Sequence, residues 1–125
     1  KNVLLVDDSI VRGTTSKRLV DLVRRAGAKE VYFVSTCAPI RHPCYYGIDF
    51  PTSKELIATT HSKEEIRRFI GVTTIEYISL EGLLKAVRNV SAGFCLACFD
   101  SRYPVLPADL MSKDALERAS IGSPA

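Results

Sequence analysis

The chain has 125 residues, of which 46% are hydrophobic and 25% charged, and its formal net charge is +3. This length suits one domain, and the scattered basic residues argue against a nucleic-acid-binding surface built from a basic block. No apolar run approaches the roughly 18 residues that a membrane span needs, so we expect neither a membrane protein nor, without a signal peptide, a secreted one.

The first third of the chain predicts a strand, a helix and a second strand. Residues 2–6 form an apolar run typical of a strand buried in a parallel sheet. Apolar residues recur at helical spacing over residues 15–26, and Gly27 follows as a C-terminal cap. Residues 30–36 are rich in β-branched and aromatic residues, which favours a second strand. This order predicts a parallel βαβ unit. Because a strand begins at residue 2, we expect the chain to be the C-terminal part of a longer protein.

The rest of the chain predicts an irregular segment and several short helices. Residues 38–53 contain three prolines and a glycine, which is typical of an ordered loop. Ser62 and Glu65 form a capping-box pattern at a helix start, and Ser79 is a second N-cap candidate. The predicted helices cover residues 53–58, 62–70, 79–88 and one or two turns within 113–119.

Two carboxylates and a phosphate-binding pattern follow the first strand directly. Asp7 and Asp8 end the strand, and Arg-Gly-Thr-Thr at residues 12–15 opens the helix. The first amide groups of a helix are unpaired and favour an anion, and Gly13 lets the backbone approach a phosphate. Arg12 adds charge, and the two threonines add hydroxyl donors. With the carboxylates placed for sugar hydroxyls or Mg²⁺, the loop predicts a ribose 5-phosphate site.

A phosphorelay receiver domain is an alternative interpretation of the acidic pair, because its first strand also ends in two acidic residues. A receiver needs a further aspartate at the end of a buried strand and a lysine before a proline. Asp49 is roughly in place, but the residues before it form a poor strand, and no Lys-Pro pair occurs. A third interpretation is that Asp7 and Asp8 are solvated loop carboxylates that cap the helix.

Four cysteines occur in a chain without a secretory signal, which favours reduced thiols, metal ligation or core packing over disulfides. Cys95 and Cys98 form a Cys-x-x-Cys motif between aromatic residues, which is a moderate metal signal. A structural zinc site and two packed thiols are the simpler interpretations. Cys37 follows the second strand, and we expect it to pack against neighbouring side chains.

The stretch VLLVDDSIVRGTT, residues 3–15, resembles the signature of type I phosphoribosyltransferases. With the continuation IRHPCYYGID, KELIA, EEIRRFIG, SLEGLL and FCLACF, the chain resembles the C-terminal quarter of glutamine phosphoribosylpyrophosphate amidotransferases, the amidophosphoribosyltransferase family. The resemblance covers residues 2 to about 104. It implies an α/β fold in which residues 1–50 end the phosphoribosyltransferase domain and residues 51–125 form a mostly helical C-terminal extension.

The complete enzyme of this family joins a glutaminase domain to the transferase domain. It transfers glutamine-derived ammonia to phosphoribosyl pyrophosphate and forms 5-phosphoribosylamine, the first step of purine biosynthesis. The resemblance implies that Asp7 and Asp8 hold the ribose hydroxyls and a Mg²⁺, and that the 5′-phosphate loop comprises Ser9, Arg12, Gly13, Thr14 and Thr15. We expect the glutaminase domain and the first transferase strands to be absent from this chain, which therefore holds no catalytic residue and is inactive alone.

Some members of the family carry a 4Fe–4S cluster, whose ligands match Cys44, Cys95 and Cys98, with the fourth thiolate expected upstream of this chain. The resemblance also implies purine nucleotide feedback inhibitors and a homo-oligomeric complete enzyme in the cytoplasm, with no nucleic-acid or membrane partner. The alternative function is a non-catalytic regulator that binds phosphoribosyl pyrophosphate, or another type I phosphoribosyltransferase. The cysteine set favours the amidotransferase.

Overall fold

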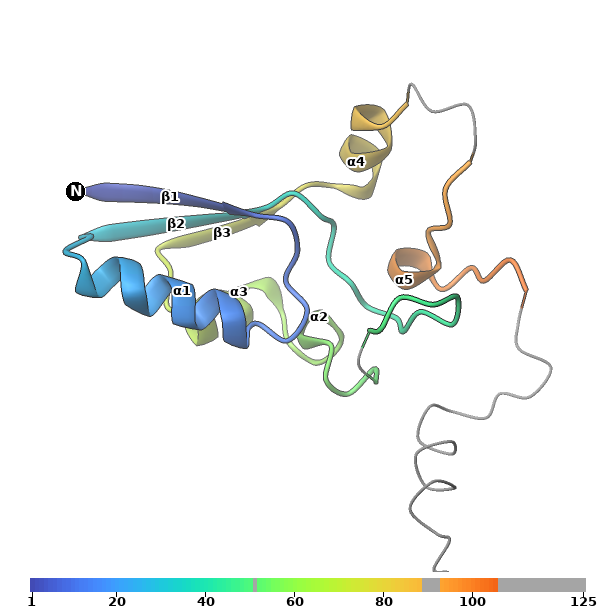
Figure 1. Cartoon of the computed structure of the whole chain (residues 1–125), viewed down its shortest axis with the longest axis horizontal. Helices are drawn as coiled ribbons and strands as arrows, with labels where there is room; N and C mark the ends of the chain where they lie inside the picture. The colour runs from blue at the N-terminus through green and yellow to red at the C-terminus, as the bar shows by residue number, and fades with distance from the viewer. Residues whose placement is uncertain (51, 89–92, 106–125) are drawn as a thin grey trace, which may run out of the picture.

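The computed structural model describes residues 1–50, 52–88 and 93–105, and the helix predicted within 113–119 lies outside them. The described chain forms a parallel sheet with two helices packed on one face and shorter helices near its carboxyl edge (Figure 1). The elements, in chain order, are β1 (Asn2–Asp7), α1 (Thr14–Arg25), β2 (Glu30–Ser35), α2 (Ile57–Thr60), α3 (Lys63–Ile70), β3 (Thr74–Tyr77), α4 (Leu80–Ala86) and α5 (Ala97–Asp100).

The sheet has the order β1-β2-β3, and both strand pairs are parallel. In its register Leu4 lies beside Tyr32, and Tyr32 lies beside Thr74. The predicted βαβ unit is therefore confirmed. β3 was not predicted, because a four-residue strand with a single fully buried side chain, Ile75, is too short to show a period.

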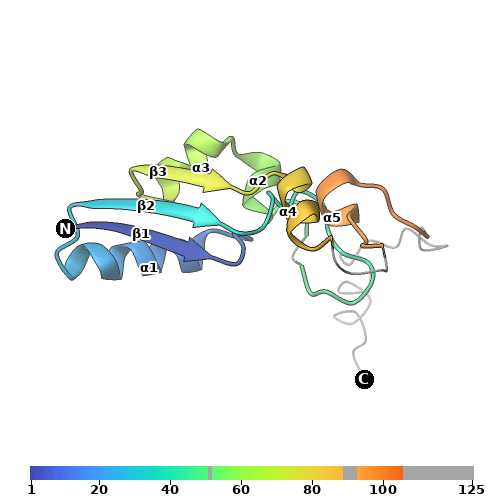
Figure 2. The same ribbon diagram turned by 90° about the horizontal axis from the view of Figure 1, so that it is seen from above.

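One hydrophobic core unites both sides of the expected division at residue 50. α1 and α3 lie on the same side of the sheet (Figure 1), α1 along β1 and α3 along β3 (Figure 2). Side chains from all three strands and helices α1 to α3 contribute to the core: Leu5, Val20, Val31, Phe33, Ile57, Ala58, Ile66, Ile70 and Ile75. Described residues on both sides of residue 50 therefore share this core.

The opposite face of the sheet has no helix along most of its length in the described chain (Figure 1). Leu4 and Val6 of β1 point to this side and are 61% and 62% exposed. The prediction that the first strand is buried was wrong for this face, because no helix of the described residues covers it and the side chains of β1 alternate between the core and solvent.

The predicted helix boundaries are mostly confirmed by their capping contacts. Gly27 follows α1 with φ +96°, and the amides of Gly27 and Ala28 donate to carbonyls of the last turn, as in a Schellman motif. Ser62 and Glu65 form the capping box of α3, and Ser79 caps α4. The helix predicted over 53–58 instead covers four residues, Ile57–Thr60. No helix among the described residues is long and apolar enough to cross a membrane.

Candidate functional site

All seven residues that were expected to bind a phosphoribosyl group line one pocket. The pocket lies at the carboxyl end of β1, where it meets α1, and has a volume of about 260 Å³. This edge of a parallel sheet is where open α/β folds bind their ligands. Its lining consists of Asp7, Asp8, Ser9, Val11, Arg12, Gly13, Thr14, Thr15 and Ser16.

One half of the pocket is the first turn of α1. Gly13 is the N-cap, with φ +75° and no side-chain hydrogen bond to the helix, and the first turn holds no acidic residue. The first amide groups of α1 therefore have no intrahelical or side-chain partner in the described structure, and the helix dipole favours an anion beside them. Thr14 and Thr15 are exposed, so their hydroxyl groups are accessible to a ligand.

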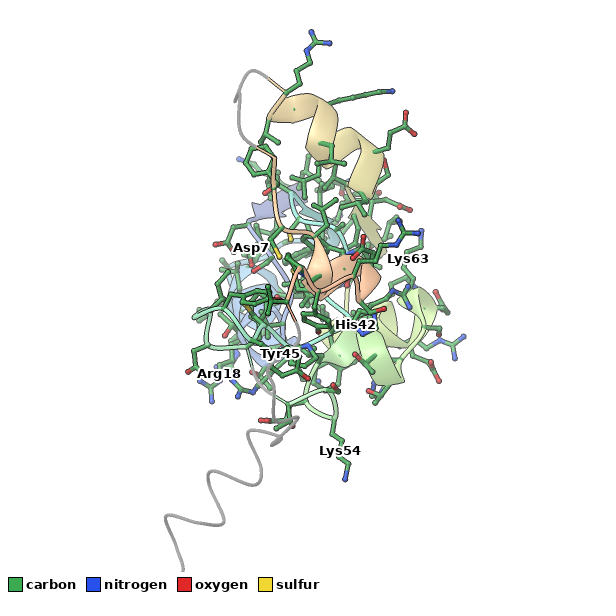
Figure 3. All side chains as sticks on the ribbon, turned by 90° about the vertical axis from the view of Figure 1, so that its right-hand side faces the viewer. Asp7, Arg18, His42, Tyr45, Lys54 and Lys63 are labelled. Atoms are coloured by element: carbon green, nitrogen blue, oxygen red, sulfur yellow. The ribbon has the colours of Figure 1, made fainter. Side chains whose placement is uncertain are left out.

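The carboxylate half is the end of β1. Asp7 is partly buried, and its Oδ1 accepts a hydrogen bond from the amide of Asp8 over 3.0 Å. The main-chain carbonyl of Asp7 accepts from the amide of Thr36 over 2.9 Å, which ties this turn to the end of β2. Asp8 is exposed and accepts from the hydroxyl of Ser9 over 3.4 Å. Figure 3 shows Asp7 beside the sheet edge, well away from the outward-pointing Lys54. Two carboxylates thus stand beside a helix turn whose first amides have no partner among the described residues.

Three residues that were not predicted as part of the site pack against this loop or bond to it. Ile57 donates its amide to the carbonyl of Val11 over 2.9 Å, and its side chain lies against Gly13. The ring of Phe69 also lies against Gly13. Glu55 accepts a hydrogen bond from Nε of Arg12 over 3.1 Å. These residues lie more than 40 positions from the loop residues that they contact, so no local pattern could have identified them.

A second pocket, also of about 260 Å³, brings Cys44, Cys95 and Cys98 to one cavity with apolar and aromatic walls. The amides of Arg41 and His42 both donate to the carbonyl of Cys98 over 3.0 Å, which holds the Cys-x-x-Cys segment against the loop that carries Cys44.

Aromatic side chains complete the contact between these two segments. Tyr103 donates its hydroxyl to the carbonyl of Pro43 over 2.7 Å, and its ring lies 4.9 Å from that of Tyr45. The amide of Tyr46 points to the sulfur of Cys44 over 3.4 Å. Tyr45 and Tyr103 therefore pack together between the loop that carries Cys44 and the segment that follows Cys98.

The thiols of the cysteine cavity are not grouped closely enough, among the described residues, to hold a single metal ion. Within the described ranges, no three cysteine, histidine or acidic side chains are close enough to hold one ion. In a 4Fe–4S cluster each thiolate binds a different iron atom, so its ligands stand further apart than those of a single zinc ion. Burial raises the pKa of the Cys98 thiol to about 11, and the nearby thiols, first Cys37, add to this shift.

Several other candidates have ordinary surroundings. Asp49 lies in an irregular loop and not at the end of a strand, so the receiver arrangement is not formed. His61 is exposed and its ring contacts the hydroxyl of Thr60. Glu64 pairs with Arg67 and Arg68 over 2.7 and 2.9 Å on the exposed face of α3.

Comparison with known proteins identifies relatives for nearly the whole chain, although no family model matches it. An amidophosphoribosyltransferase from Methanothermobacter thermautotrophicus is 48% identical over 122 residues, which is 96% of this chain and 26% of that relative. This alignment extends beyond residue 104, where we expected the resemblance to end.

Two solved structures share the fold. One, described as the allosteric regulatory enzyme of purine biosynthesis, has a TM-score of 0.75 and 53% identity over 83% of this chain and 23% of its own. The other is glutamine phosphoribosylpyrophosphate amidotransferase from B. subtilis, complexed with ADP and GMP, with a TM-score of 0.75, 53% identity, and coverage of 82% and 24%. The chain spans about a quarter of the length of the proteins it matches. The resemblance and the α/β fold that its motifs predicted are therefore confirmed.

Proposed function

We propose that this chain is the phosphoribosyl-binding part of an amidophosphoribosyltransferase, which transfers glutamine-derived ammonia to phosphoribosyl pyrophosphate. The observation that carries the proposal is the pocket beside α1, which collects all the residues expected for this ligand. The similarity to enzymes of purine biosynthesis supports the same assignment. The reaction itself belongs to complete amidophosphoribosyltransferases, and this chain spans about a quarter of the length of the relatives it matches.

The loop supplies binding and charge, and it does no covalent chemistry. The amides of the first turn of α1, the hydroxyls of Thr14 and Thr15, and Arg12 would hold the 5′-phosphate. The hydroxyls of the ribose would then lie toward Asp7 and Asp8. When the bond between the ribose and the pyrophosphate breaks, positive charge grows on the sugar, and nearby carboxylates stabilise it. Mg²⁺, when bound through these carboxylates, would neutralise charge on the departing pyrophosphate.

Binding of phosphoribosyl pyrophosphate to the complete protein tests this assignment. Asp7→Asn or Asp8→Asn should weaken binding in the presence of Mg²⁺ by about tenfold or more, since each removes a charged hydrogen-bonding group. Asp21→Asn is the matched control, because Asp21 is an exposed carboxylate further along α1 and does not line the pocket. Calorimetry that finds no binding by the unchanged protein, or equal binding by all variants, would refute the proposal.

We also propose that Cys44, Cys95 and Cys98 provide three thiolates for a 4Fe–4S cluster, with the fourth from another part of the complete protein. The shared cavity and the aromatic contacts around it support this assignment. The cluster would tie the segment around α5 to the loop after β2. Anaerobically purified protein should contain iron and sulfide and should be brown. Cys44→Ala should lose both, whereas Cys37→Ala should retain them.

The complete enzyme is expected in the cytoplasm, as a homo-oligomer that purine nucleotides inhibit. The related B. subtilis structure contains ADP and GMP. A nucleotide monophosphate has the same ribose 5-phosphate group as the substrate, so the loop at residues 12–15 could hold either ligand. Competition between GMP and phosphoribosyl pyrophosphate in the binding assay tests this expectation.

A further inference from the structure

We propose that Glu55 is a positioning residue for phosphate recognition, which acts by orienting Arg12. This inference rests on the proposed function and deepens it. It adds a residue that does not line the pocket and acts through one that does. Glu55 reaches the loop from residues 52–57, which lie far from the loop in sequence and beside it in the fold.

The contact between the two side chains uses one corner of the guanidinium. Nε of Arg12 donates to Oε1 of Glu55 over 3.1 Å. No other hydrogen bond of this guanidinium occurs in the described parts of the chain, so its two terminal nitrogens keep their donors. Arg12 lines the pocket. A guanidinium that is anchored at Nε presents its terminal nitrogens in a fixed plane, which is the geometry that recognises a phosphate with two parallel hydrogen bonds.

Glu55 is itself held in place. Its Oε2 accepts from the amide and the hydroxyl of Thr52 over 3.3 and 3.2 Å. Two residues further on, the amide of Ile57 donates to the carbonyl of Val11, next to Arg12. The same segment therefore fixes the backbone of the loop at Val11 and the side chain of Arg12. A mobile surface pair would lack this second attachment.

Electrostatics favour orientation as the role of Glu55. The hydrogen bond from Arg12 lowers the pKa of Glu55, so the carboxylate stays charged at neutral pH. The side chains are 54% and 49% exposed, and exposed ion pairs contribute little to stability. The pair should therefore affect ligand affinity through the position of the guanidinium more than it affects folding.

The test is a double-mutant cycle in the complete protein, with phosphoribosyl pyrophosphate and ribose 5-phosphate as ligands. Glu55→Ala should weaken binding of both ligands by about three- to tenfold, because Arg12 loses its anchor. Glu55→Gln should retain most of the affinity, since its amide oxygen can still accept from Nε. In the Arg12→Ala background, Glu55→Ala should change affinity by less than about twofold. KM for phosphoribosyl pyrophosphate should rise with little change in kcat, because the 5′-phosphate is remote from the reacting carbon.

Each outcome is decisive. Equal affinity of Glu55→Ala and the unchanged protein would overturn the inference while leaving the proposed function in place. So would an undiminished effect of Glu55→Ala in the Arg12→Ala background, or a parallel loss of thermal stability with no rescue by Glu55→Gln. Absence of any binding by the unchanged protein would instead refute the proposed function, and the inference with it.

Discussion

Replacing Gly13 with alanine tests whether the phosphate loop depends on the close approach of α2 and α3. Gly13 has φ +75°, in the left-handed region that costs an alanine about 1–2 kcal/mol. A Cβ there would also lie 2.9 Å from Cδ1 of Ile57 and 3.2 Å from Cε1 of Phe69. Forcing extra volume into packed surroundings costs about 1–3 kcal/mol. Together these terms predict a local loss of about 2–5 kcal/mol in Gly13→Ala.

The Gly27→Ala variant separates the conformational cost from the packing cost. Gly27 has φ +96°, but a Cβ at this position would meet nothing within 4 Å. It should therefore lose only the conformational part, about 1–2 kcal/mol. The assay is native-state amide hydrogen exchange of α1, which reports the free energy of opening this segment. Phosphoribosyl pyrophosphate binding should also fall in Gly13→Ala and stay unchanged in Gly27→Ala.

Ile57→Val provides a rescue test, because it removes the Cδ1 atom that a Cβ on residue 13 would meet. In the unchanged protein this substitution should cost about 0.5–1.5 kcal/mol, as is usual for a buried isoleucine. In the Gly13→Ala background it should cost less, or should stabilise. If Gly13→Ala proves no more costly than Gly27→Ala, or if Ile57→Val costs the same in both backgrounds, the packing argument is wrong.

Three further predictions concern α3 and β3. Arg67 and then Arg68 hold the pKa of Glu64 at about 2, below its ordinary 4.5, so the stabilisation from this carboxylate is complete above pH 4.5 and is lost as the pH falls toward 2. Glu64→Gln should therefore speed amide exchange in α3 at pH 7, and the difference from the unchanged protein should disappear near pH 2. Ser62→Ala removes the capping box and should cost about 1 kcal/mol in the same exchange assay, and no change in α3 would contradict this role. The Tyr77 hydroxyl is buried without a hydrogen-bond partner in the described residues, so Tyr77→Phe should leave the thermal midpoint unchanged or raise it, and a clear decrease would reveal a missing partner.

The grouping of residues 7–9 and 11–15 in one pocket could be predicted from the sequence because these residues are nearly contiguous. The carboxylates, the glycine and the threonines lie within nine positions, residues 7–15, and the strand and helix beside them have strong patterns. The caps at Gly27, Ser62 and Ser79 were equally local. Each of these features depends on residues no more than a few positions apart.

The supports of the loop could not be predicted in the same way. Glu55, Ile57 and Phe69 reach the loop only after the chain has formed β2 and turned back. Nothing in the sequence around an exposed glutamate or a helical phenylalanine indicates such a contact. β3 was missed for another reason: its four residues include Glu76 and Thr74, whose side chains face away from the core.

The uncovered face of the sheet affects how variants of this chain should be interpreted. Leu4 and Val6 look replaceable on this chain alone, because water already reaches more than half of each side chain. Tyr32 and Val34 of the neighbouring strand lie on the same side, so the four side chains form an apolar strip across the two strands. Exposed apolar strips of this kind associate with one another, so the segment should aggregate when it is produced by itself at high concentration. Substitutions at Leu4 and Val6 should therefore be tolerated better in the isolated segment than in a longer polypeptide that covers these side chains.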